Sequence, residues 1–153
     1  MTKKLEISLV IPALAEFVGV ARLAISGVAS RMNFTIDEIE DIKISLSEAC
    51  TNVIQHAYGE QVDAEKNIID IKIYIIGNEL EIVVKDFGTG FDVAIIGTKE
   101  QRKNSQEKMG LGLGLTFIKS LMDQSEFKSE KGEGTVIQMR KQSNNFDVAS
   151  LKI

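Results

Sequence analysis

The chain contains one cysteine, one histidine, one proline and no tryptophan among its 153 residues. Because a single cysteine, Cys50, cannot form a disulfide within the chain, the sequence favours a reducing compartment, and we expect the cytoplasm. Cys50 lies near the apolar stripe of a predicted helix and is expected to act as a small buried hydrophobe. No apolar run reaches the length of a membrane span, and Glu6 and Glu16 interrupt the segment that a signal peptide would need.

Basic residues are also too few and too scattered for broad nucleic-acid binding. Lysine and arginine total 18 against 22 aspartate and glutamate residues, and the formal net charge is −4. We therefore expect a small ligand or a protein as partner, with no direct binding of nucleic acid or membrane. A chain of 153 residues that is 44% hydrophobic is long enough for one domain with its own core. We expect that domain over residues 1–142 and a flexible tail over 143–153.

The periodicity of the apolar residues predicts both strands and helices. Alternation with period two indicates strands, and recurrence every three to four residues indicates helices. Thr35 is followed three residues later by Glu38, a capping box that marks the start of a long helix. The expected elements are a strand over 5–11, a helix over 13–32, the long helix from Thr35 to about Tyr58, hairpin strands over 69–75 and 79–85, a helix after Gly114, and hairpin strands over 126–131 and 135–141.

Three polar residues of the long helix, Glu48, Asn52 and His56, are spaced by four. Side chains at this spacing lie above one another on one flank, so the carboxylate and the carboxamide point toward the same place. An acid that accepts a proton, beside an oxygen that suits a hard cation such as Mg²⁺, is a combination that can act on a phosphate. A solvated helix face is the alternative interpretation, and we interpret His56 as structural.

Glycines cluster at two places further along the chain. Asp86-Phe87-Gly88-Thr89-Gly90 follows a predicted strand directly, which indicates either a backbone that passes close to a ligand or a simple loop. Gly110-Leu111-Gly112-Leu113-Gly114 comes immediately before an amphipathic run, and we expect these glycines to lead into a helix start whose free amides bind phosphate. The pattern is neither a Walker loop nor a dinucleotide fingerprint, because no Gly-Lys-Ser/Thr follows and no βαβ unit surrounds it.

The segment between these two clusters, residues 93–109, is the least patterned part of the chain. A loop of this length in a compact domain is either a lid over a ligand or a solvated insertion. Thr135, just after the second hairpin turn, either places a hydroxyl on a phosphate or simply favours the strand.

Taken together, four motifs resemble the ATP-binding fold shared by gyrase, Hsp90, histidine kinases and MutL. They are Glu48-x-x-x-Asn52, Asp86-x-Gly88-x-Gly90, Gly110-x-Gly112-x-Gly114-Leu115 and Gly134-Thr135, in this order. Within that superfamily, the chain resembles the bacterial anti-sigma-factor serine kinases. The features that carry this resemblance are the short chain, the sequence of residues 47–58 and Leu121-Met122-Asp123. The resemblance spans residues 5–141. It implies an α+β fold, a two-layer α/β sandwich with helices on one face of a mixed, mostly antiparallel sheet and a lid at about 93–109.

The resemblance also implies a role for each matching residue. Glu48 would be the general base, and Asn52 would coordinate Mg²⁺. At the adenine end of ATP, Asp86 would accept from the exocyclic amine, with Gly88, Gly90 and Thr135 around the base. Gly110, Gly112, Gly114 and Leu115 would line the phosphates. Some members carry an arginine just before these glycines, where this chain has Gly110, so Lys108, Arg102 or Lys99 would have to supply that charge.

The function implied is that of an enzyme that is also a binding switch. It would use ATP and Mg²⁺ to phosphorylate a serine of an anti-anti-sigma protein of the STAS type, and otherwise sequester an RNA polymerase sigma factor, as a homodimer. A nucleotide-gated partner-switching module that transfers nothing is the alternative, and the presence of Glu48 favours the kinase. A detached histidine-kinase domain is disfavoured, because we see no upstream helix with a phosphoacceptor histidine.

Overall fold

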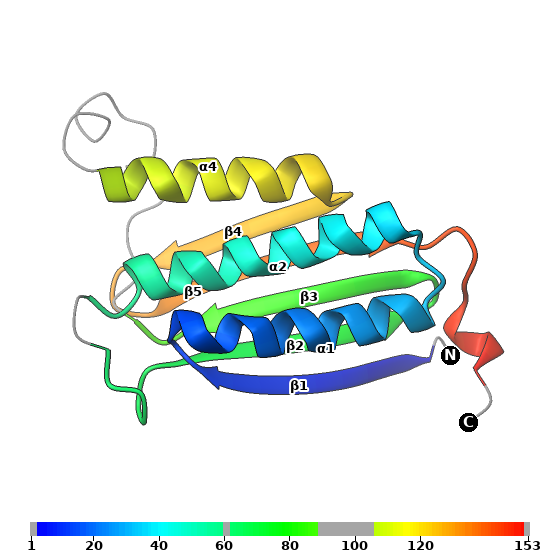
Figure 1. Ribbon diagram of the computed structural model, residues 1–153, viewed down its shortest axis with the longest axis horizontal. Helices are drawn as coiled ribbons and strands as arrows, with labels where there is room; N and C mark the ends of the chain where they lie inside the picture. The colour runs from blue at the N-terminus through cyan, green and yellow to red at the C-terminus, as the bar shows by residue number, and fades with distance from the viewer. Residues whose placement is uncertain (1–2, 60–61, 89–105, 152–153) are drawn as a thin grey trace.

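The computed structural model describes residues 3–59, 62–88 and 106–151. Each element expected from the periodicity is present. The helix expected over 13–32 begins as the 3₁₀ turn η1 and continues as α1, and the largest difference is the start of α4. The elements, labelled as in Figure 1, are β1 (Lys4–Pro12), the 3₁₀ turn η1 (Ala15–Phe17), α1 (Val18–Arg31), α2 (Ile36–His56), β2 (Ile68–Ile76), β3 (Glu79–Asp86), α4 (Gln106–Leu121), β4 (Gln124–Glu130), β5 (Gly134–Gln142) and the 3₁₀ turn η3 (Val148–Ser150).

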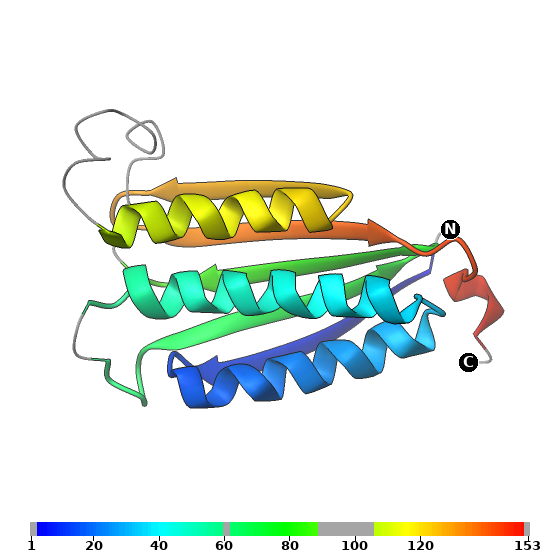
Figure 2. The same ribbon diagram turned by 45° about the horizontal axis from the view of Figure 1, so that its top comes forward.

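The five strands form one sheet in the order β1-β2-β3-β5-β4. The helices α1, α2 and α4 lie side by side on one face of this sheet, as the two views in Figures 1 and 2 show. This confirms the α+β two-layer fold. All four strand pairs among the described residues are antiparallel, whereas a mixed, mostly antiparallel sheet was expected. The reason is the path after β3, since the chain returns through α4 and the edge strand β4 before β5 pairs with β3.

The core lies between the sheet and the helices. On β2, Ile69, Ile71 and Ile73 face the helices and are fully buried, as a period of two requires. On α2, the stripe that includes Ile42 and Leu46 is equally buried. No helix in the described ranges is both long enough and apolar enough to cross a bilayer.

The boundaries of α2 fix where its polar flank lies. Thr35 Oγ1 accepts from the Glu38 amide at 3.1 Å, and Glu38 Oε1 accepts from the Thr35 amide at 2.9 Å, so the predicted capping box is formed. The helix ends at His56, and Gly59 follows with φ of 76°. This end of α2 lies at the same end of the molecule as the end of β3 and the starts of β5 and α4 (Figure 1).

The expectation that Gly110, Gly112 and Gly114 precede a helix start is wrong. All three lie inside α4, which begins at Gln106. Glycine costs about 1 kcal/mol relative to alanine in a helix interior, but it does not prevent a helix that packs on a neighbour. Amides beyond the first four of a helix donate within it, so in this structure the glycine amides do not form the predicted open cradle.

The C-terminal segment also differs from the expected flexible tail, since its described part is docked on the domain. Ser143 Oγ donates to the Met32 carbonyl at 2.6 Å, and the Val148 amide donates to the Gly77 carbonyl at 2.7 Å. Val148 is 1% exposed. The segment therefore holds the β2–β3 turn against the α1–α2 turn, at the end of the molecule opposite to the end of β3 (Figure 1).

Candidate functional site

A small cavity lies between α2 and the sheet, where α2 and β3 end and β5 begins. Asn52, Asp86 and Thr135 line it, together with apolar side chains of the surrounding elements. The structure thus brings together three residues that are distant in the sequence: Asp86 follows Asn52 by 34 positions, and Thr135 follows Asp86 by 49. Each comes from a different element, α2, β3 or β5, so the cavity exists only in the folded chain.

Asp86 is the buried acid of this cavity, with only 2% of its surface exposed. Its Oδ1 accepts from the Gly88 amide at 2.9 Å and from the Thr135 amide at 3.2 Å. Burial raises the pKa of Asp86, and the bonds from the Gly88 amide and from Thr135 partly offset that rise. The carboxyl group is therefore fixed in orientation and suited to accept a hydrogen bond from a ligand that enters the cavity.

Two glycines allow the backbone to close around Asp86. A Cβ on Gly88 would overlap the carbonyl oxygen of Ala57, and a Cβ on Gly134 would overlap the carbonyl oxygen of Asp86. Gly134 also has φ of 83°, which side-chain-bearing residues rarely adopt. Any larger residue at these positions would push α2 or β5 away from Asp86.

Glu48 and Asn52 face the middle of α4. A Cβ built on Gly114 would lie 3.2 Å from Glu48 Oε2 and 3.1 Å from Asn52 Oδ1, so the predicted flank of α2 meets a glycine on its neighbour. Asn52 is 5% exposed, and its Nδ2 has no hydrogen-bond partner among the described residues. A buried amide in this state fits a polar ligand in the adjoining cavity.

The donor set suits Mg²⁺ only together with a nucleotide. The described residues contain no group of three or more His, Cys, Asp or Glu side chains that converge on one point. Asn52 supplies one hard oxygen, and Mg²⁺ commonly takes its other ligands from phosphates and water. The residues present therefore fit a magnesium ion that arrives with bound phosphates.

Comparison with known proteins places these features in a family. Residues 11–141 match the model of the histidine kinase-like ATPase domain. The serine-protein kinase RsbW of Halalkalibacterium halodurans is 41% identical, over 82% of this chain and 77% of the relative. The serine-protein kinase RsbW of Bacillus subtilis is 39% identical, over 90% of this chain and 86% of the relative. The chain belongs to the serine-protein kinase RsbW family.

A solved structure gives independent support for the fold of this RsbW family member. The histidine kinase domain from the blue-light activated histidine kinase of Erythrobacter litoralis superimposes with a TM-score of 0.52. The match covers 86% of this chain and 61% of that chain, at 17% sequence identity. At this identity the likeness shows a shared histidine-kinase-like ATPase fold.

The remaining residues proposed for the RsbW-family site lie either outside the described ranges or in α4. Gly90, Lys99 and Arg102 are outside the described residues, as is the predicted lid up to residue 105. Lys108 lies in the first turn of α4, with Gly110 and Gly112 following in the next turns. Leu115 of the same helix is partly buried and packs against the core.

The sequence interpretation missed Tyr58 and Ser129, which contact residues of the site. The Tyr58 hydroxyl donates to the Ile68 carbonyl at 2.6 Å and accepts from the Phe87 amide at 2.9 Å. The Ser129 hydroxyl lies 3.2 Å from the Thr135 hydroxyl. Tyr58 was detectable only as the last residue of the helix motif that carries Asn52, and Ser129 gave no signal apart from its place in a hairpin strand.

Cys50 takes no part in the site. It is fully buried in α2, and burial raises the pKa of its thiol to about 12. A thiol that stays protonated is a poor nucleophile, so the expectation of a small buried hydrophobe is confirmed.

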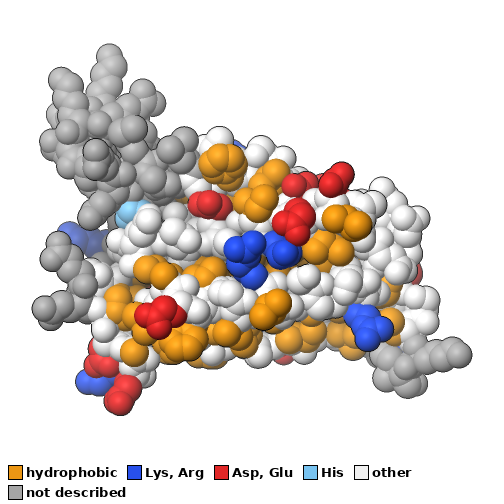
Figure 3. Space-filling model, in the orientation of Figure 1, with side chains coloured by type: hydrophobic (Ala, Val, Ile, Leu, Met, Phe, Trp, Pro, Cys, Tyr) orange, Lys and Arg blue, Asp and Glu red, His pale blue; other side chains and the backbone are white. Residues whose placement is uncertain are grey.

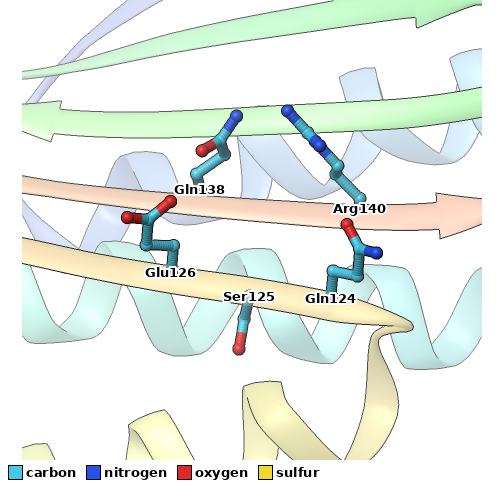
Figure 4. A pocket seen from close by; sticks show the side chains of 5 residues that line it. All are labelled: Gln124, Ser125, Glu126, Gln138 and Arg140. Atoms are coloured by element: carbon cyan, nitrogen blue, oxygen red, sulfur yellow. The ribbon is translucent and has the colours of Figure 1, made fainter.

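A second pocket lies apart from this site, on β4 and β5. Figure 4 shows Gln124, Glu126, Gln138 and Arg140 on one side of these strands, with Ser125 pointing the other way. None of the predicted site residues lines it. On the face shown in Figure 3, the lysine and arginine side chains form small patches among acidic and apolar ones rather than a continuous basic surface.

Proposed function

We propose that this protein is an ATP- and Mg²⁺-dependent protein-serine kinase that also acts as an anti-sigma factor. The observation that carries the proposal is the buried, oriented carboxyl group of Asp86 in a cavity that it shares with Asn52, one helical turn from Glu48. Along this site, Asp86 would bind adenine, Asn52 would bind the metal ion and Glu48 would accept the proton.

The adenine end of ATP would lie in the cavity at Asp86. A carboxylate oxygen accepts from the exocyclic amine of adenine, and the apolar side chains around it pack on the ring. Thr135 would support the base through the hydroxyl that contacts Ser129, while Gly88 keeps the turn close to α2. Gly90 would continue this turn beside the base.

The phosphates would then run between α2 and α4, where Gly114 leaves space beside Glu48 and Asn52. Mg²⁺ bound at Asn52 would neutralise phosphate charge. Asn52 would also orient the phosphates through the amide end that has no partner among the described residues. In this proposal Lys108, Gly110, Gly112 and Leu115 of α4 would also line the phosphates, with Lys99 and Arg102 as further sources of positive charge.

Glu48 would act as the general base on the protein substrate. Its carboxylate takes the proton of the attacking serine hydroxyl as the serine oxygen bonds to the γ-phosphorus. The bond from that phosphorus to the bridging oxygen breaks, and ADP leaves. Phosphoryl transfer depends mainly on positioning and charge neutralisation, so this small set of residues is sufficient.

The partners follow from the family resemblance of the motifs. The phosphorylated protein would be a STAS-type anti-anti-sigma antagonist, and the sequestered protein would be an RNA polymerase sigma factor. We propose that the chain acts as a homodimer. The single reduced thiol of Cys50 supports action in the cytoplasm.

A nucleotide-gated binding module without transfer is the second candidate. It would need Asp86 and Asn52 but not Glu48, since binding alone requires no base. The position of Glu48 against the same glycine as Asn52 favours the kinase.

The test is incubation of the purified protein with Mg²⁺ and γ-labelled ATP, with and without STAS-type proteins from the same genome. The kinase predicts label on a serine of one candidate, and no label when Mg²⁺ is chelated. Tight ATP binding with no labelled candidate would instead support the binding module.

A further inference from the structure

The hairpin of β2 and β3 determines which of its residues exchange hydrogen bonds. The strands are joined by a two-residue turn, and Ile76 pairs with Glu79 across it. In such a hairpin the pair that flanks the turn exchanges both backbone bonds, and every second pair along the ladder does the same. Asp70 and Lys85 form the last pair of this kind in the observed ladder. Continuing the register, the next would be Ile68 with Phe87.

The hydroxyl of Tyr58 occupies the place of that next pair. It donates to the Ile68 carbonyl at 2.6 Å and accepts from the Phe87 amide at 2.9 Å. These are the carbonyl and the amide that would bond to each other if the ladder continued. A phenol donates one hydrogen bond and accepts others, so one hydroxyl satisfies both groups. The β2–β3 ladder therefore stops at Asp86, and the chain leaves the sheet there.

The residue before Tyr58 also contacts the turn after β3. Tyr58 follows Ala57, and the Ala57 carbonyl is the atom against which Gly88 packs. Asp86 Oδ1 holds the turn from within by accepting from the Gly88 amide. Phe87 is exposed and its ring lies beneath the Lys85 ammonium, so its contact with Tyr58 is made by its backbone amide.

We infer that Tyr58 is a positioning residue whose hydroxyl separates β2 from β3 at Ile68 and Phe87, and so presents Asp86 to the nucleotide. Without that hydroxyl, the Ile68 carbonyl and the Phe87 amide are free to bond to each other, which draws the turn toward β2 and away from the cavity. Burial raises the pKa of Tyr58, so the phenol stays protonated and remains a donor. The separation of the strands is a property of the protein alone, while its effect on ATP rests on the proposed function.

The experiment compares Tyr58→Phe with Tyr74→Phe in the full chain. Phenylalanine keeps the ring and removes only the hydroxyl. Tyr74 is the other tyrosine of the chain. It lies on β2 beneath Lys4 and pairs with Glu81, five residues before Asp86, so it is a matched control. We measure the dissociation constant of ATP with Mg²⁺ by calorimetry, and the rate of phosphoryl transfer at saturating ATP. We expect Tyr58→Phe to bind ATP about tenfold more weakly with a nearly unchanged saturated rate, and Tyr74→Phe to match the wild type.

A second readout does not depend on the nucleotide. In nucleotide-free protein, the amide resonances of Phe87 and Gly88 should shift in Tyr58→Phe and stay in place in Tyr74→Phe. Unchanged resonances, unchanged ATP affinity in Tyr58→Phe, or an equal loss of affinity in both variants would overturn the inference. If the wild type itself fails to bind ATP, the proposed function fails, and the amide resonances alone then decide whether Tyr58 holds the turn.

Discussion

Gly114 of α4 faces Glu48 of α2 so closely that a Cβ at position 114 would lie 3.2 Å from Glu48 Oε2. The same Cβ would lie 3.1 Å from Asn52 Oδ1. At these distances both polar side chains must move by a few tenths of an ångström to accept even a methyl group. The space beside the proposed base and metal ligand therefore depends on the glycine.

Gly114→Ala should separate stability from activity. Alanine is the better helix former, so the free energy of unfolding should stay the same or rise by up to about 1 kcal/mol. Because a misplacement of about 1 Å can cost a hundredfold in rate, we expect transfer to fall by about tenfold. Urea denaturation and the labelled-ATP assay on one preparation check both parts. Gly27→Ala in α1, where a Cβ meets nothing within 4 Å, is the matched control and should leave transfer unchanged.

Gly88→Ala should behave in the opposite way. Its Cβ would overlap the Ala57 carbonyl oxygen, which belongs to the backbone and cannot rotate aside. We expect a loss of about 1–3 kcal/mol in the free energy of unfolding, together with weaker ATP binding. Denaturant titration measures the first and calorimetry the second. A variant as stable as the wild type would show that the turn does not press on the end of α2.

Asp86→Asn should weaken ATP binding, because it replaces an oriented carboxylate with an amide at the adenine end. Hydrogen bonds to charged groups contribute about 1.5–3 kcal/mol, so the dissociation constant should rise on the order of ten- to a hundredfold. Calorimetric titration with ATP and Mg²⁺ measures it. Unchanged affinity would remove Asp86 from the nucleotide site.

The difference in stability between the wild type and Asp86→Asn should also depend on pH. Burial raises the pKa of Asp86 in the folded protein, so the folded state holds this proton more tightly than the unfolded state does. The stability contributed by Asp86 is therefore full below its unfolded pKa and is lost as the pH rises through its folded pKa. At neutral pH, Asp86→Asn should be at least as stable as the wild type, and the difference should shrink in acid. Thermal unfolding of both proteins from pH 3 to 7 tests the sign, and a wild type that gains on the variant as the pH rises would contradict it.

Much of the fold follows from local patterns in the sequence. The isoleucines of β2 alternate with period two, and the apolar residues of α2 recur with helical period. Both patterns show in the sequence which face of the element is buried. The start of α4 could not be predicted, because the cost of Gly110 and Gly112 in a helix is local whereas packing on α2 is tertiary. The docking of Val148 on the β2–β3 turn could not be predicted either, because it is a contact between segments that are distant in the sequence.

The residues of the candidate site could be predicted from the sequence, but the contacts between them could not. The order of the motifs selected Asn52, Asp86 and Thr135, and the structure places them around one cavity. The role of Tyr58 could not be predicted, because it requires knowing that the end of α2 lies beside the first residue of β2. Local spacing identifies polar residues on one helix, but contacts between elements appear only in the folded chain.

Phosphoryl transfer by Glu48→Gln tests whether Glu48 is the general base of a serine kinase. Glutamine keeps the shape of the side chain and removes the base, and a general base contributes about 10²–10⁴ in rate. We measure ATP affinity and the single-turnover rate of serine labelling for the wild type and the variant, with the same antagonist protein. We expect near-equal affinity and a loss of at least about a hundredfold in rate. Equal rates in the two proteins would contradict the role of Glu48 as the base.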